Sequence, residues 1–572
     1  MPRPSDHGSL PGMHRAGALL LILAGAWLPG QARAGELRLW IAQAALPLLV
    51  LLWVPELAPR RTWLRLLPWG LLVFGTLLQA PAQPAPGAAL AVLLVQLGWL
   101  GAGLLGLGAA AQPPSPSPVR RVAGWAAAAG AVAAGPGLAF AGGTFGNADL
   151  LAGFLALTLL WTLPLVVSGD RATDDGRQRA WSPLRWLGLV ALGLQAAALV
   201  VSQSLGAWLA VAVGGWAWWA VGRWRWPQPA ESKVPYIRKA LVLFVMPLLV
   251  LAASLLSPMV QEHLAARGYL YRVGLTVAGT ALPWGVGPGR FHGSFLDAQA
   301  ALAAREPATL DHWTNAEHAH SEAGQLLAEQ GPLGLLLGLL PFALLVLRPR
   351  AHPAWAAGVA GLVLAQLSLP LYEPATAFLL AFSVGWALGD PATSPRAASA
   401  PAAPCEWRRA VSWPGLWRPL GLALALIALL LGTAELLASR LLVRGVAAGA
   451  VEPVALAAEL SLRPARARRH QATLLLDPDP ARALVVAREA VRLDPSPAAL
   501  VLEGQAAMRL RAPHLALPPL QAAVRLAPRS FAAHFDLARA YEEAGDRFQA
   551  RRHATRARSL RPTDPRLRWL PE

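Results

Sequence analysis

Long runs of apolar residues alternate with short polar segments through most of the chain. A helix needs about 20 apolar residues to cross the hydrocarbon core of a bilayer, and runs of that order recur between residues 37 and 437. They predict an all-α, polytopic membrane protein with about 12 to 13 transmembrane helices. The predicted spans are residues 37–55, 64–80, 86–110, 119–141, 149–168, 184–201, 204–222, 238–257, 331–347, 353–370, 374–389 and 417–437.

The basic residues between these runs predict an orientation, because cytoplasmic loops are enriched in Arg and Lys. Arg60 and Arg61 lie in one loop, the next loop at 79–86 carries no charge, and the alternation continues along the chain. Two segments are then outside: the loop at 258–330 and the region 438–572. In a bacterial envelope this predicts a multi-pass protein of the inner membrane with a large periplasmic loop and a periplasmic C-terminal domain.

The amino terminus allows two interpretations. Arg15 precedes an apolar run from Ala16 to Leu28, and the small-residue pattern Ala32-Arg33-Ala34 follows. Residues 1–36 are therefore either a signal peptide or a short first transmembrane helix.

Composition narrows the class of protein further. Hydrophobic residues make up 55% of the chain and charged residues 14%, which a water-soluble globule could not carry without a large exposed apolar surface. The net charge of +18 would suggest nucleic acid in a soluble protein, but here the bases orient the chain in the bilayer, so we expect no nucleic-acid partner. The single cysteine, Cys405, excludes an intramolecular disulfide.

A short motif recurs in the region after the last predicted span. Its copies are Leu493-Asp494-Pro495, Leu526-Ala527-Pro528 and Leu560-Arg561-Pro562. Their spacing matches the period of about 34 residues of tetratricopeptide repeats, in which a proline ends the second helix of each pair. We therefore expect residues 438–572 to form helical repeats that dock a periplasmic protein partner, with a generic pair of helical hairpins as the alternative.

The loop at 258–330 carries a glycine-rich turn flanked by arginines. Gly285, Gly287 and Gly289 could bring backbone N–H groups close to an anion, as glycine-rich turns do for phosphates. Such a run also serves simply to turn a chain at a membrane surface. Arg272 and Arg290 bracket the turn, and guanidinium groups suit bidentate capture of phosphate oxygens.

Two histidines, His318 and His320, lie near the end of the same loop. A zinc site is one interpretation, with His312 and Glu317 close by, but no third ligand stands at a regular spacing. A second is a pair of surface histidines at the membrane interface. The third is a general base, because an imidazole with a pKa near 6.5 accepts a proton from a hydroxyl at neutral pH.

Taken together, these segments resemble the superfamily of O-antigen ligases and polymerases, bacterial envelope glycosyltransferases that use a lipid carrier. The resemblance covers roughly residues 37–437. Its four pieces are Phe145-Gly146-Asn147, the turn Ser204 to Gly206, the run Gly285 to Phe291, and His318-Ala319-His320-Ser321 leading into Glu329-Gln330-Gly331-Pro332-Leu333-Gly334.

The resemblance implies transfer of a glycan from undecaprenyl diphosphate to an acceptor hydroxyl at the periplasmic face, with no metal and no cofactor. By position, His320 would be the base, Arg272 a ligand of the diphosphate, and Arg290 and His318 supporting residues. Gly285, Gly287, Gly289 and Ser321 would shape the loop around them. Many members have Arg in the Ser-x-Gly turn, where this chain has Leu205, and Asn where it has Ser321.

The acceptor stays open at this point. Lipid A-core would make the protein an O-antigen ligase, a protein hydroxyl an O-oligosaccharyltransferase, and the growing glycan a polymerase. Two non-enzymatic alternatives are a polysaccharide transporter, which should carry ionisable residues within its spans, and an envelope scaffold built around the C-terminal region.

Overall fold

The structure is a computed structural model, and it describes residues 64–110, 116–139, 147–167, 183–225, 258–389 and 414–570, together with Leu20 and Phe145. Within these ranges every regular element is a helix and there is no strand, so the predicted all-α class is confirmed there. The interpretation of residues 1–36, apart from Leu20, and the predicted spans 37–55 and 238–257 lie outside the described residues.

Five of the described helices are long and apolar enough to cross a membrane. Except at the start of α13, their bounds follow the apolar runs closely, and they identify the chain as a membrane protein. They are α5 (Pro86–Ala110), α6 (Pro116–Ala139), α7 (Ala148–Val167), α8 (Pro183–Ser202) and α13 (Glu322–Val346). Shorter apolar stretches form α4 (Leu67–Gln79), α14 (Pro353–Leu367), α15 (Pro374–Leu388) and most of α9 (Leu205–Arg225). A total of 12 to 13 spans stays a prediction.

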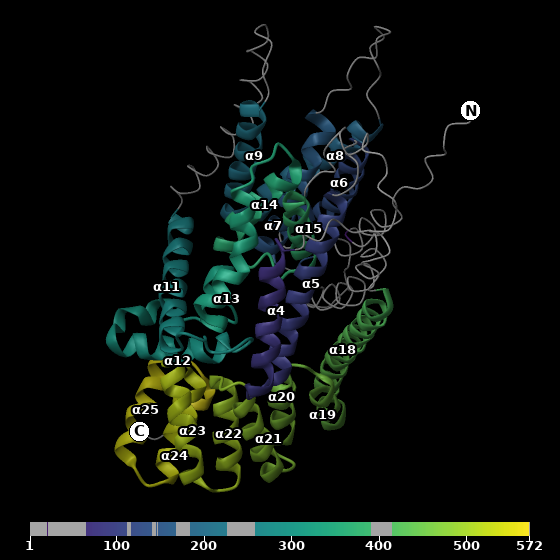
Figure 1. Cartoon of the computed structure of the whole chain (residues 1–572). Coiled ribbons are helices and arrows are strands. Elements are labelled where there is room, and N and C mark those ends of the chain that lie inside the picture. The colour runs from purple at the N-terminus through teal and green to yellow at the C-terminus, as the bar shows by residue number, and fades with distance from the viewer. Residues whose placement is uncertain are drawn as a thin grey trace, which may run out of the picture.

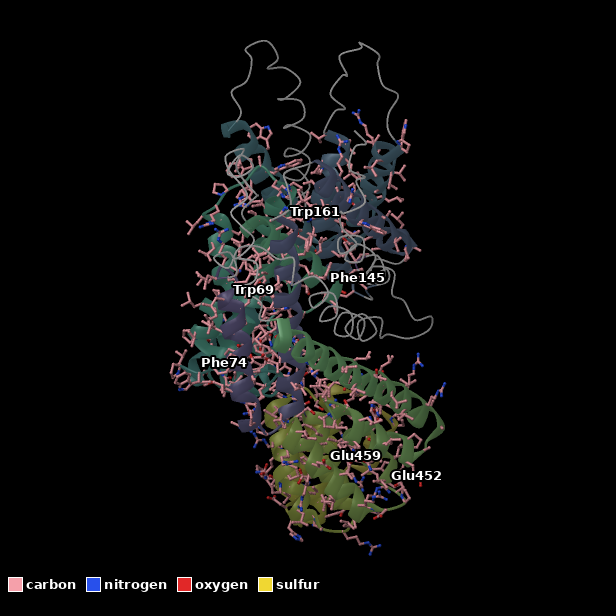
Figure 2. All side chains as sticks on the ribbon, turned by 45° about the vertical axis from the view of Figure 1, so that its right-hand side comes forward. Trp69, Phe74, Phe145, Trp161, Glu452 and Glu459 are labelled. Carbon is pink, nitrogen blue, oxygen red and sulfur yellow. The ribbon has the colours of Figure 1, made fainter. Side chains whose placement is uncertain are left out.

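Buried tryptophans, among them Trp69 and Trp161, hold these helices together (Figure 2). The indole of Trp69 on α4 donates to the Gly338 carbonyl of α13 at 3.0 Å, and that of Trp161 on α7 donates to Ser383 of α15 at 2.9 Å. Trp99 on α5 donates to the Leu371 carbonyl at 2.8 Å. Because indole N–H groups need a partner when buried, these bonds fix the helices and also the segment 368–373, which borders the site described below.

The predicted outer loop is itself mostly helical. It contains α11 (Pro258–Thr280), α12 (Phe291–Arg305) and the 3-10 helix η5 (Pro307–His312). α13 begins at Glu322, before the predicted span at 331–347, and Ser321 caps it by accepting from the Gly324 N–H at 3.2 Å. The sequence suggested a later start because α13 is kinked at Gly331, just before Pro332. The buried carboxylates Glu322 and Glu329 therefore belong to α13.

The C-terminal region is a series of helices, each packed on the next. The last predicted span lies within α18 (Pro414–Ala448), which continues past residue 437. After it come α19 (Val451–Leu460), α20 (Ala465–Leu475), α21 (Pro480–Leu493), α22 (Pro497–Arg509), α23 (Pro513–Leu526), α24 (Phe531–Glu543), α25 (Arg547–Leu560) and η6 (Pro565–Trp569). The recurring motif marks the ends of α21, α23 and α25, and these helices begin at residues 480, 513 and 547, close to the period of about 34 residues. Assignment to the tetratricopeptide class stays a prediction.

The C-terminal helices pack against the outer loop, below α12 in the view of Figure 1. Leu296 of α12 is buried in an apolar cluster made otherwise by α20 to α24. Two ion pairs flank this contact: Arg525 with Asp297 at 3.5 Å and Arg529 with Asp311 at 2.6 Å. The loop that carries the candidate site is thus packed between the membrane helices and the C-terminal region.

Candidate active site

One face of α11 carries Arg267 and Tyr271, which are four residues apart and so point the same way. Arg267 donates through Nη1 to the Leu367 carbonyl at 2.5 Å and pairs through Nη2 with Asp149 at 3.3 Å. The hydroxyl of Tyr271 donates to the Gln366 carbonyl at 2.8 Å. This face of α11 is thereby fixed to the end of α14 and the start of α7.

Arg272 lies on a different face of the same helix. Its Nη2 contacts both carboxylate oxygens of Glu306, at 2.8 and 2.7 Å, and both side chains are about half exposed. Burial raises the pKa of the neighbouring Tyr269 to about 12, and the charge of Arg272 opposes that shift. Arg272, the residue predicted to bind the diphosphate, therefore lies beside Tyr269 and the end of α12 and is paired with Glu306.

His320 is exposed in the segment between η5 and α13, with a left-handed backbone of φ 52°. Partial burial lowers its pKa, the positive charge of Arg267 lowers it further, and the negative charge of Asp149 opposes the shift. An imidazole with a lowered pKa is neutral at neutral pH and can accept a proton. The charged neighbours of this candidate base are thus Arg267 and Asp149.

His318 points into the protein instead. Its ring lies 5.3 Å from that of Tyr372, and its Nδ1 is buried with no hydrogen-bond partner among the described residues. Burial lowers the pKa of His318 to about 3, and the positive charge of Arg463 acts in the same direction. His318 is therefore neutral and packed against Tyr372, whereas His320 is the exposed member of the pair.

The N–H groups of the glycine turn are used within the protein. Gly285 donates to Ala281 at 2.8 Å, and Arg290 donates to Gly287 at 3.2 Å. Val286 and Gly287 donate to Ala328 and Glu329 of α13, at 2.8 and 2.9 Å. The turn therefore binds its own chain rather than presenting these donors to an anion. The exposed side chain of Arg290 makes no hydrogen bond or ion pair within the described residues, so it is free to meet a ligand.

Close packing explains why glycines are needed here. A Cβ on Gly285 would lie 2.4 Å from the Glu329 carbonyl carbon, and one on Gly331 would lie 2.0 Å from the Pro283 carbonyl oxygen. Both glycines also have positive φ, 78° and 67°, which side chains disfavour. The glycine turn and the kink of α13, about 45 residues apart in sequence, are thus one interlocked unit.

Gln325 connects this unit to the histidine segment. Its Oε1 accepts from the Ala319 N–H at 2.8 Å, and its Nε2 donates to Glu329 Oε1 at 2.8 Å. The same carboxylate oxygen accepts from the Phe291 N–H at 3.3 Å. Buried polar groups that satisfy one another in this way fix their surroundings, so the backbone between the two histidines is held relative to the start of α12.

The two remaining motif pieces meet at Arg267. Asn147 caps α7 by accepting from the N–H of Asp149 at 2.8 Å, which places the Asp149 carboxylate beside the guanidinium. Gly206 packs on Leu367, where an added Cβ would lie 3.4 Å from the leucine side chain. The carbonyl of Leu367 is the group that Arg267 binds.

Comparison of the chain with protein-family models and with curated proteins gave no match. Among the described residues, no three His, Cys, Asp or Glu side chains are grouped closely enough to hold a metal ion.

Several residues of the site were missed from the sequence. Arg267 and Asp149 are 118 positions apart, and no local pattern links them. The four-residue spacing of Arg267 and Tyr271 would have been a usable signal had a helix been predicted there. Gln325 and Glu329 show the same spacing, but no helix was predicted from the sequence just before residue 331.

Proposed function

We propose that the protein is an O-antigen ligase-like glycosyltransferase, which transfers a glycan from undecaprenyl diphosphate to an acceptor hydroxyl at the periplasmic face of the bacterial inner membrane. One observation supports this above all. His320 is exposed within electrostatic range of Arg267 and Asp149. Arg267 binds Asp149, which is next to the cap Asn147, and the carbonyl of Leu367, whose side chain packs on Gly206. Pieces of sequence that the resemblance groups together therefore meet around a candidate base.

The proposed reaction needs a base for the acceptor. As the new bond forms between the acceptor oxygen and the anomeric carbon of the glycan, the acceptor proton passes to His320 and the bond from that carbon to the diphosphate oxygen breaks. His320 begins this step neutral because its pKa is lowered. The negative charge of Asp149, which raises the pKa of His320, then favours the imidazolium that forms.

The departing diphosphate needs positive charge, because fixed cations near a leaving group lower the barrier. Arg290 is exposed and unpaired among the described residues, so it can bind phosphate oxygens directly. Arg272 can do so only by exchanging Glu306 for the substrate. Arg267, held by Asp149 and Leu367, is better suited to fixing the frame around His320.

The surface next to the glycine turn fits a lipid donor. Trp284 is 68% exposed and Leu282 is 56% exposed. Tryptophan is typical of the interface between a bilayer and water. A polyprenyl chain lying along this surface would bring its diphosphate towards Arg290.

The test is transfer by the full-length protein in nanodiscs, with an undecaprenyl-diphosphate-linked glycan as donor. His320→Ala should lower kcat by about 10²- to 10⁴-fold, the usual contribution of a general base. His312→Ala is the matched control, because His312 is also exposed but contacts Tyr269, with ring centres 5.9 Å apart. Undiminished transfer by the His320 variant would contradict the proposal.

One experiment can distinguish the three candidate acceptors. Mass spectrometry of surface glycans and periplasmic proteins from a deletion strain distinguishes them, because loss of lipid A-linked glycan, of protein-linked glycan or of long polymer indicates a ligase, a protein oligosaccharyltransferase or a polymerase respectively.

A further inference from the structure

A short segment of the C-terminal region, residues 461–464, reaches the outer end of the membrane helices. The Glu435 carboxylate of α18 accepts from the Ser461 hydroxyl at 3.0 Å and from the Leu462 N–H at 2.6 Å. The Arg463 N–H in turn donates to Ser461 Oγ at 3.0 Å. Hydrogen bonds to a carboxylate are stronger than those between neutral groups, so they give the segment a defined conformation.

The segment packs on the first turn of α5. A Cβ on Gly87 would lie 2.1 Å from the Leu462 carbonyl oxygen, so the two backbones are in direct contact. The next residue of α5, Ala88, is the neighbour of Gly289 in the glycine turn, at 3.0 Å from the Cβ that Gly289 lacks. The first turn of α5 is therefore packed between the glycine turn and the segment 461–464.

Each of these two contacts is followed by an arginine. Arg290 comes after Gly289, and Arg463 comes after Leu462. Both side chains are exposed, and neither makes an ion pair within the described part of the chain. Both cations are therefore available to an anion at the first turn of α5, and the positive charge of each would attract such an anion.

The charge of Arg463 also acts on the buried part of the site. It contributes to the lowering of the pKa of His318 and opposes the rise in the pKa of Tyr372. Arg463 is thus electrostatically coupled to His318 and to the tyrosine ring that packs on it.

We propose that Arg463 is a substrate-binding residue, contributed by the C-terminal region, that binds the diphosphate of the lipid carrier together with Arg290. This rests on the proposed function. It gives the C-terminal region a direct part in the site, in addition to any partner that it docks.

The experiment measures binding of undecaprenyl diphosphate to the full-length protein in detergent, with undecaprenol as the uncharged probe. Arg463→Gln should raise the Kd for the diphosphate about 10- to 100-fold, the value of one charged hydrogen bond, and should leave the Kd for undecaprenol unchanged. Arg463→Lys should recover part of the affinity. Arg466→Gln is the matched control, since Arg466 is an exposed arginine one turn further along the chain.

A second variant separates binding from folding. Glu435→Ala removes the acceptor that holds Ser461 and Leu462, so it should weaken diphosphate binding while Arg463 itself is retained. Unchanged diphosphate affinity in Arg463→Gln, in a protein whose transfer depends on His320, would overturn this inference and leave the proposed function standing. A wild-type protein that binds undecaprenyl diphosphate no better than undecaprenol would overturn both.

Discussion

The interlock between the glycine turn and α13 gives a prediction with a worked magnitude. Gly331 has φ 67° and ψ −170°, a conformation nearly restricted to glycine, and a side chain there costs about 1–3 kcal/mol. A Cβ would also lie 2.0 Å from the Pro283 carbonyl oxygen, so Gly331→Ala must push the turn away from the helix. That movement breaks the bonds from Val286 and Gly287 to α13, at a net cost of about 1 kcal/mol each.

The free energy of unfolding should therefore fall by about 3–5 kcal/mol. We would measure it from thermal and denaturant unfolding of the purified protein in one detergent, followed by tryptophan fluorescence. Gly279→Ala is the control, because Gly279 is exposed on α11 and no atom lies within 4 Å of the added Cβ; alanine favours the helix there. If Gly331→Ala were as stable as Gly279→Ala, the interlock would not hold the two motifs together.

Two further predictions concern charge. Because the folded-state pKa of His318 is about 3, the unfolded chain binds a proton below pH ~6.5 that the folded protein does not, so stability is lost as pH falls from about 6.5 towards 3. His318→Phe should reduce this loss when the free energy of unfolding is measured across pH. An acid profile unchanged from that of the wild-type protein would contradict the prediction. Glu306→Gln should alter stability by less than about 1 kcal/mol, because its pair with Arg272 is half exposed. If Arg272 binds the donor diphosphate, the same variant should lower the KM for the donor, whereas an unchanged or higher KM would argue against that role.

Local sequence patterns were sufficient to predict where several of the described helices lie. The apolar run at residues 86–110 and α5 have the same bounds, and the recurring motif marks the ends of three C-terminal helices. These features depend on periodicity and on proline, which act within a few residues. The predicted span at 331–347 starts at the kink of α13 at Gly331, and no helix was predicted from the sequence for the stretch from Glu322 that precedes this kink.

The candidate site could be predicted only in part from the sequence, because its geometry depends on which faces of the helices its residues occupy and on contacts between distant positions. Arg272 and Arg267 are five residues apart on α11, and that spacing puts them on different faces. Only the folded chain shows that Arg267 pairs with Asp149 and acts on His320, whereas Arg272 pairs with Glu306. The glycines were noticed for the donors that they might offer, but they serve close packing.

The contact between α12 and the C-terminal helices has a consequence for how the protein is made. Synthesis runs from the amino terminus, so the membrane helices and the outer loop exist before residues 472–540, which surround Leu296. Until then this leucine has no cover from its own chain, and Asp297 and Asp311 lack the arginines that pair with them. Nascent chains stalled before residue 472 should consequently leave α12 accessible to protease, and the outer loop should settle only when residues 472–540 have been translated.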